Sequence, residues 1–190
     1  MLEKIPSPIG RALRSARPGP RELVYNHPQL KAVTERMALG SSAFAHGERI
    51  PRRYTADGAK LSPPLRWSGV PLETASLVLL IEDADSPTPK PLVHALVWDL
   101  APNDGELAEG ALPSFGSDDV EGMGRNSFMQ RAFLPPDPPP AHGLHRYAFQ
   151  LFALDQLLHF ERAPGRSKLL ESLEGHAIAK GCLIGTYERT

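Results

Sequence analysis

The chain has 190 residues, of which 41% are hydrophobic and 23% charged, and it carries 20 prolines and a formal net charge of −1. A chain of this length closes one sizeable hydrophobic core, and its many prolines favour chain reversals over long helices. Because Cys182 is the only cysteine, an intramolecular disulfide and a thiolate metal cluster within one chain are both excluded.

The charged residues are unevenly distributed. Residues 1–60 carry 11 Lys and Arg against 5 Asp and Glu, a balance of +6, whereas the remainder carries 10 against 17, a balance of −7. A nucleic-acid-binding protein concentrates Lys and Arg on its folded body, so nucleic acid is not expected as a partner. No stretch has the length and apolarity of a secretory signal or a membrane span. We therefore expect a cytoplasmic protein without integral membrane association.

Residues 1–40 are expected to form an N-terminal arm that precedes a single domain at 41–190. Two proline-rich breaks, Pro6-Ser7-Pro8 and Pro18-Gly19-Pro20, enclose a short basic piece at 11–14 that is compatible with two turns of helix. We expect this arm to be a loosely packed extension, with a docking or dimer-swapped segment as the alternative.

From residue 41 onward, turn clusters separate short apolar runs, which is the spacing of a β-rich protein. The clearest strands are predicted at 75–82, 93–100 and 147–154. Each is dense in Leu, Val and aromatic residues and is bounded by Pro, Gly or Asp. Because several are apolar on both faces, we expect central strands that are buried on both sides.

One helix is predicted near the C-terminus, beginning near Ser167 as its N-cap. Gly175 is a potential break, and Gly181 ends the helix. Residues 181–188 then form a final strand that docks back into a sheet. Because sheet edges need cover, a homodimer is also expected. The apolar stripe of the helix comprises Leu169, Leu170, Leu173, Ala177 and Ile178.

Polar side chains gather in three segments at the ends of the predicted strands, where a sheet gives a site rigid support. Residues 82–86 follow the first strand and precede Pro87, His94 lies inside the second, and His145 heads the third after the proline-rich segment 134–144. Each segment also has a purely structural interpretation: turn chemistry for the acids, a core histidine bonded to a backbone carbonyl, and a proline-rich spacer.

These segments together resemble motifs of the phosphatidylethanolamine-binding and Raf-kinase-inhibitor-like family, in particular its bacterial YbhB/YbcL type. Asp83-Ala84-Asp85-Ser86-Pro87 is similar to an Asp-Pro-Asp-x-Pro motif, and Pro138-Pro139 through Gly143-Leu144-His145-Arg146-Tyr147 is similar to a Pro-Pro…Gly-x-His-Arg-Tyr signature. Segments 54–70 and 185–189 fit the family's early and C-terminal patterns. The resemblance covers residues 43–189, and it departs at Ala84, where proline is usual, and at 91–93, where aromatic residues are common.

The resemblance implies an antiparallel β-sandwich with a few short peripheral helices and a pocket at one end of the larger sheet. The implied ligand is a small phosphate-like or carboxylate anion, with no cofactor and no metal. His94 and Tyr147 would contact the anion and Asp83 would orient a histidine, with His145 shared between these roles, because imidazoles and a tyrosine hydroxyl are directional donors and a carboxylate fixes a ring tautomer. The implied pocket residues are Asp83, Asp85, His94, Pro138, Pro139, His145 and Tyr147.

A metal-dependent enzyme is one alternative, since carboxylates and imidazoles are metal ligands. No His-Glu-x-x-His motif supports it. His142 and His145 lie three residues apart, and in an extended segment such residues point to opposite faces. The ligand set would be Asp83, Asp85, His94, His142 and His145.

A serine hydrolase is the second alternative, with Ser86 or Ser127 as its nucleophile. The chain lacks a Gly-x-Ser-x-Gly elbow, so we expect binding and not catalysis. A third alternative is a protein-interaction module that inhibits a kinase or protease partner, because an anion pocket with a proline-rich rim also fits a phosphorylated side chain.

Overall fold

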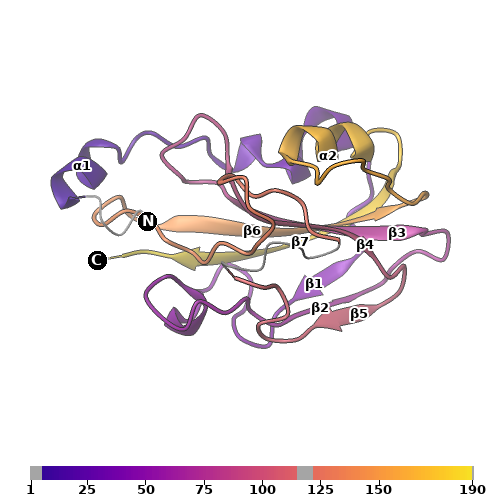
Figure 1. Ribbon diagram of the computed structural model, residues 1–190, viewed down its shortest axis with the longest axis horizontal. Helices are drawn as coiled ribbons and strands as arrows, with labels where there is room; N and C mark the ends of the chain where they lie inside the picture. The colour runs from indigo at the N-terminus through magenta and orange to yellow at the C-terminus, as the bar shows by residue number, and fades with distance from the viewer. Residues whose placement is uncertain (1–5, 115–121, 190) are drawn as a thin grey trace.

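Two antiparallel sheets form the body of the protein in the computed structural model, which describes residues 6–114 and 122–189. The larger sheet has the strand order β4-β3-β6-β7 and the smaller sheet the order β1-β2-β5. Figure 1 shows the sheets as stacked layers, with α2 and the N-terminal segment on the outer side of the larger sheet. The predicted fold class, a mainly β sandwich with few short helices, is therefore confirmed. The strands are β1 (Ala38–Gly40), β2 (Leu65–Ser68), β3 (Ser76–Asp83), β4 (Leu92–Leu100), β5 (Gly105–Leu107), β6 (His145–Leu154) and β7 (Ala177–Tyr187).

Helices are short, as the proline content predicts. Two are α-helices, and none in the described part of the chain has the length and apolarity to cross a membrane. The helices are α1 (Ser7–Ala12), α2 (Arg166–Leu173) and the 3₁₀ turns η2 (Pro20–Glu22), η3 (Val24–Asn26), η4 (Pro28–Leu30) and η5 (Arg52–Tyr54).

The larger sheet is buried on both faces because its strands are apolar in both of their side-chain sets. One set, including Leu79 and Phe149, packs toward the smaller sheet. The other set, including Leu80 and Phe152, packs against α2 through Leu169. Side chains alternate between the faces with a period of two, so an unbroken apolar run in β3 supplies both cores. The sequence-based prediction of strands buried on both sides is confirmed.

The C-terminal helix is shorter than predicted. It ends at Leu173, and no side-chain bond caps its start, where Gly165 and not Ser167 is the N-cap. Ala177 and Ile178 belong to β7, which pairs with β6 from Ala177 onward. The reason is that Gly175 adopts a left-handed φ of 76°, which ends the helix and turns the chain into the sheet.

Both edges of the larger sheet are covered by the chain itself. Segment 34–50 hydrogen-bonds along β7, with the amides of Gly47 and Ile50 donating to carbonyls of Ile184 and Thr186. Segment 122–134 does the same along β4, for example from the amide of Leu134 to the carbonyl of His94. Edge cover was the reason to expect a homodimer, and these edges no longer supply that reason.

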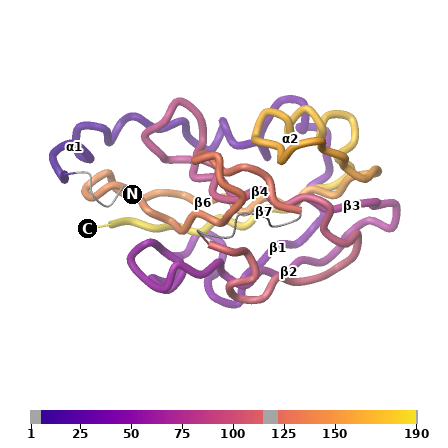
Figure 2. Tube along the Cα trace, viewed as in Figure 1, coloured from indigo at the N-terminus to yellow at the C-terminus, as the bar shows by residue number. Residues whose placement is uncertain are grey.

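The N-terminal segment packs on the outer face of the larger sheet, as Figure 2 traces. Val24 and Leu30 are 0% and 1% exposed. The amide of Val24 donates to Glu82 at 2.9 Å, and Lys180 donates to the carbonyls of Tyr25 and Leu30 at 3.0 and 3.1 Å. The expectation of a loosely packed extension was therefore wrong for residues 19–33, because these buried partners lie far along the chain.

Candidate functional site

Polar side chains from three strands meet at one end of the larger sheet, on the face toward the smaller sheet. Asp83 ends β3, and the antiparallel register pairs it with Tyr147 near the start of β6. His145 stands two residues before Tyr147 and so shares its face. The Asp83 Oδ2 and His145 Nδ1 atoms lie 2.7 Å apart, and both side chains are buried. The structure thus brings these three predicted residues together.

His94 reaches the same face through a β-bulge. Ile81 and Glu82 are consecutive in β3, but their partners in β4 are Ala95 and Val93, so His94 is the extra residue. A bulge re-aims the side chain of the extra residue. The His94 ring lies edge-on to the Tyr147 ring, with ring centres 5.1 Å apart.

One nitrogen of the His94 ring is already hydrogen-bonded within the protein. Its Nδ1 lies 2.7 Å from the carbonyl oxygen of Leu134, so Nδ1 carries the proton and donates it. Burial lowers the pKa of His94, against the opposing charge of Asp83. In the neutral ring, Nε2 therefore presents a lone pair.

His142 joins the site, which the alternation rule had excluded. Its Nδ1 lies 2.7 Å from His145 Nε2, and its Nε2 lies 2.8 Å from the carbonyl oxygen of Leu13. The prediction that His142 and His145 point to opposite faces was wrong because Gly143 between them has a φ of 99°. At that φ the segment is a turn, and the period of two does not apply.

These groups form a buried chain of hydrogen bonds, Asp83–His145–His142–Leu13, and its geometry determines which ring nitrogens carry protons. The Leu13 carbonyl needs a proton on His142 Nε2, and an ionised Asp83 needs one on His145 Nδ1. If both rings were neutral, two lone pairs would then face each other across 2.7 Å. One added proton between the two rings would remove this clash and would make the buried group neutral in total. Burial, with the charges of His145 and Arg17, lowers the pKa of His142.

Tyr147 presents a buried hydroxyl without a full hydrogen bond. Its side chain is 1% exposed, and Oη has no partner at full hydrogen-bond distance among the described residues. Burial, together with the charge of Asp83, raises the pKa of Tyr147 well above its usual value. A backbone hydrogen bond from Asp137 has a smaller effect and lowers the pKa. The phenol is therefore a neutral donor, and such a group costs free energy until an acceptor arrives.

Asp85 lies in the same turn but serves other partners. Its carboxylate accepts two hydrogen bonds from the Arg146 guanidinium, at 2.6 and 2.7 Å, and forms an ion pair with Arg17 at 3.3 Å. Although burial opposes ionisation, the hydrogen bonds from Arg146 lower the pKa of Asp85. Its backbone amide donates to Asp83 Oδ1 at 2.8 Å. Asp85 thus holds the turn and Asp83 in place.

The proline-rich loop is fixed by the C-terminal end of the chain. Arg189 donates to the carbonyl of Pro138 at 2.7 Å and forms ion pairs with Asp57 and Asp137, both at 2.8 Å. Pro139 is buried, and its carbonyl accepts the amide of His142. The loop is a rigid rim for the histidines. Arg17, Asp57 and Arg189 were not predicted, since their roles depend on contacts distant in sequence, and His142 was predicted only as a ligand of the alternative metal site.

The alternative enzyme assignments find no support in the geometry. No three His, Cys, Asp or Glu side chains converge as a metal site within residues 6–114 and 122–189. Ser86 Oγ bonds to the Asp83 carbonyl and to Thr88, and Ser127 Oγ accepts the amide of Val93. Neither hydroxyl bonds to a histidine, so neither of the two proposed serines has the base partner that a serine hydrolase needs.

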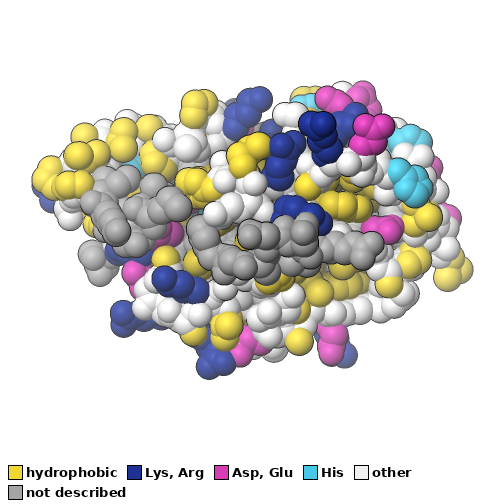
Figure 3. Space-filling model, viewed as in Figure 1, with side chains coloured by type: hydrophobic (Ala, Val, Ile, Leu, Met, Phe, Trp, Pro, Cys, Tyr) yellow, Lys and Arg dark blue, Asp and Glu magenta, His cyan; other side chains and the backbone are white. Residues whose placement is uncertain are grey.

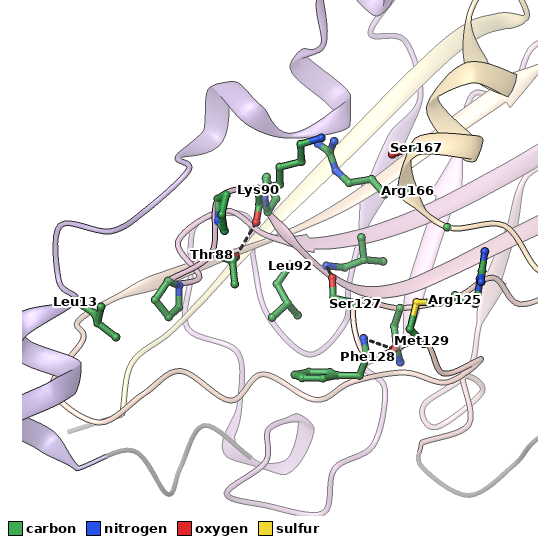
Figure 4. Close-up of a pocket in the computed structure, with 16 residues that line it drawn as sticks. Leu13, Thr88, Lys90, Leu92, Arg125, Ser127, Phe128, Met129, Arg166 and Ser167 are labelled. Carbon is green, nitrogen blue, oxygen red and sulfur yellow. Dashed lines mark hydrogen bonds between the residues drawn. The ribbon is translucent and has the colours of Figure 1, made fainter.

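A separate groove of about 750 Å³ lies beside this site and shares Leu13 with it (Figure 4). Leu92, Phe128 and Met129 give it an apolar wall, and Lys90, Arg125 and Arg166 make its charged residues all basic. Figure 3 shows basic side chains gathered near α2 beside hydrophobic ones. The Nε of Arg125 is buried and has no hydrogen-bond partner in the described structure.

Comparison with known proteins yields a consistent set of similarities. The family model described as phosphatidylethanolamine-binding protein matches residues 40–188. A UPF0098 protein of Chlamydia trachomatis is 41% identical over 157 residues, which is 80% of this chain and 99% of that protein. A UPF0098 protein of Methanothermobacter thermautotrophicus is 39% identical over 153 residues, with coverage of 80% and 99%.

Solved structures agree with these sequence matches. The crystal structure of a putative phosphatidylethanolamine-binding protein homolog from Chlamydia trachomatis has a TM-score of 0.73 at 38% identity, covering 83% of this chain and 100% of that one. YbcL of Escherichia coli, titled a new member of the mammalian family, has a TM-score of 0.73 at 25% identity, covering 82% and 99%. About a fifth of this chain has no counterpart in proteins that are otherwise matched nearly end to end.

Proposed function

This chain belongs to the phosphatidylethanolamine-binding protein family, and from that premise we propose that it binds a small anionic or phosphate-bearing ligand without catalysis. The proposed site comprises Asp83, His94, His145 and Tyr147, with Asp85, Pro138 and Pro139 as its supporting turn and rim. The observation that carries the proposal is the buried Tyr147 hydroxyl, which has no full hydrogen bond among the described residues. An anion oxygen placed between the Tyr147 and His94 rings would satisfy it.

The charge of the site favours an anion. Asp83 is hydrogen-bonded to His145, and one proton shared by the two linked histidines would balance its charge, so that the carboxylate would not repel a ligand as an unpaired charge would. The Tyr147 hydroxyl supplies a neutral donor, and His94 Nε2 supplies a charge-assisted donor once it takes up a proton. Phosphate oxygens accept such bonds readily.

A phosphate ester of a lipid head group and a phosphorylated side chain present the same oxygens to these donors. Inhibition of a kinase or protease partner would use the second source. The buried position of His145 and Tyr147, which are 0% and 1% exposed, favours a free small ligand, because a side chain on a folded partner would have to reach through the rim. The two sources differ in whether the isolated protein binds a small phosphate compound.

The test is calorimetric titration of the whole chain with inorganic phosphate and phosphorylethanolamine, with and without a chelator. Asp83→Asn and His145→Ala are expected to abolish binding while unfolding stays cooperative. The exposed pair Asp155 and His176, 3.0 Å apart, supplies matched controls, since Asp155→Asn and His176→Ala should bind as wild type. Unchanged binding in the site variants would refute the assignment, and binding lost only with the chelator would favour the metal enzyme instead.

A further inference from the structure

The N-terminal segment 6–17, termed here the strap, closes over the histidine pair. The carbonyl of Leu13 accepts the proton of His142 Nε2 at 2.8 Å. The Arg17 guanidinium donates to the carbonyls of His142 and Leu144 and pairs with Asp85. His142 is left 0% exposed. The Leu13 carbonyl oxygen thus takes the place of a ligand oxygen as the acceptor for the His142 Nε2–H group.

The strap is an addition to a domain that is complete without it. The family model begins at residue 40, and relatives matched over 99% of their length leave about a fifth of this chain unmatched. The rest of the site, from Asp83 to Tyr147, lies inside the matched region. Closure of the histidine pair by Leu13 and Arg17 is therefore a feature of this chain that the matched proteins do not need in order to fold.

The strap is held less firmly than the segment that follows it. Residues 19–33 are anchored by buried side chains such as Leu23 and Val24. In α1, by contrast, Gly10 alone is buried. Gly10 packs so closely that an added Cβ would lie 2.0 Å from the carbonyl oxygen of Pro140. Between the two parts, Gly19 turns the chain with a φ of 84°. The few buried contacts of the strap imply that it opens at a lower cost in free energy than the anchored segment.

Leu13 belongs both to the histidine cluster and to the lining of the groove drawn in Figure 4. Its carbonyl bonds to His142, and the residue is also part of the groove lining. The groove offers an apolar wall, the exposed side chains of Phe128 and Met129 (39% and 66% exposed), and basic residues without an acidic one. Such a lining complements an apolar chain attached to an anionic head.

We propose that the strap determines ligand size at the anion site. In its docked position, Leu13 and Arg17 restrict the site to small anions such as inorganic phosphate. When the strap is displaced, the site and the groove become continuous, and a phosphate monoester with an apolar chain binds with its head at the histidines and its chain along Phe128. The inference rests on the proposed anion site and adds the residues that set its selectivity.

The experiment compares inorganic phosphate with n-octyl phosphate, used below its micellar concentration, by calorimetry on the full chain. Two variants displace the strap by different means. Gly10→Val pushes α1 away from Pro140 by a steric clash, and Arg17→Gln removes the ion pair with Asp85 and weakens the hydrogen bonds to His142 and Leu144. Arg21→Gln is the matched control, because it makes the same change of charge at an exposed position in the anchored segment. n-Octyltrimethylammonium controls for binding that depends on the chain alone.

Wild type is expected to bind phosphate and to bind octyl phosphate at least about tenfold more weakly. Gly10→Val should keep its phosphate affinity. Both Gly10→Val and Arg17→Gln should gain about tenfold in their affinity for octyl phosphate, the scale expected when one or two charge-assisted hydrogen bonds no longer oppose entry. Phe128→Ser in the Arg17→Gln background should reverse the gain.

The outcomes separate the two proposals. If wild type binds neither compound, the anion site itself is refuted. If wild type binds phosphate but the strap variants do not gain octyl phosphate affinity, or Arg21→Gln or octyltrimethylammonium shows the same gain, the role of the strap is overturned. A gain that survives Phe128→Ser overturns the groove as the place of the chain.

Discussion

The Tyr147 hydroxyl connects stability with binding at the scale of one atom. It is buried without a full hydrogen bond in the described structure, and an unsatisfied buried hydroxyl costs about 1–3 kcal/mol. Tyr147→Phe is therefore expected to leave the free energy of unfolding equal or raise it by up to about 1 kcal/mol. The same change should weaken phosphate binding about tenfold, or about 1.4 kcal/mol. Urea unfolding and calorimetry measure the two effects, and a loss of both together would show that the hydroxyl has a protein partner.

His94 links anion binding to proton uptake. Its Nδ1 proton is committed to Leu134, and burial lowers the pKa of its ring, so Nε2 must gain a proton before it can donate. The groups around it are Asp83 and Asp137, which favour that proton, and His145, which opposes it. Sulfate keeps its charge between pH 5.5 and 8, so its affinity is expected to fall as pH rises.

Calorimetry of sulfate binding at pH 7.5 in two buffers of different ionisation enthalpy counts the protons. We expect uptake of about one proton per sulfate in wild type and much less in His94→Gln. Equal heats in both buffers for wild type would rule out His94 as the donor.

At this scale, sequence was a good guide to residue types and a poor guide to their partners. Asp83, His145 and Tyr147 could be predicted because they stand at strand ends with the right alternation. His142 could not, since its orientation depends on the φ of Gly143. Arg17 could not either, because its partners Asp85, His142 and Leu144 lie far along the chain, and a basic residue in an arm has no local pattern that predicts them.

At the scale of elements, the anchored part of the arm is held by a buried carboxylate. Glu82 is 0% exposed; it accepts Arg166 at 2.6 Å, and the Val24 amide and Gln150 at 2.9 Å each. Removing one member of a buried charged network costs about 3–5 kcal/mol, so Glu82→Gln should destabilise the protein by that order in urea unfolding. Glu171→Gln, at an exposed ion pair, should stay within about 0.5 kcal/mol. A loss below about 1 kcal/mol for Glu82→Gln would contradict the anchoring role.

Helices and strands were predicted correctly where the local sequence pattern and the tertiary pairing favour the same structure. β3, β4 and β6 were predicted to within two residues because their apolar runs are long and their boundaries are marked by Pro, Gly or Asp. The C-terminal helix was drawn too long because Ala177 and Ile178 continue a helical stripe and also fit a strand. Pairing with β6 decides the outcome, and no local pattern contains that pairing.

At the scale of the whole molecule, the chain covers both edges of its larger sheet with segments 34–50 and 122–134. Exposed edges were the argument for a homodimer, so we now expect a monomer of 20.7 kDa in sedimentation equilibrium at micromolar concentration. A mass near twice that value would show that another surface drives association, and the basic groove beside Phe128 would be the first to examine.

The position of the strap makes its opening measurable by energy transfer between two attached dyes. α1 and the end of β7 lie at the same end of the molecule (Figure 1), while the anchored arm holds everything after Gly19 in place. A donor dye at Ser7 and an acceptor dye at Glu188 would therefore sit close together when the strap is docked. Single-molecule energy transfer between them would record each opening as a drop in efficiency, and the fraction of time spent open would give the equilibrium that sets ligand choice.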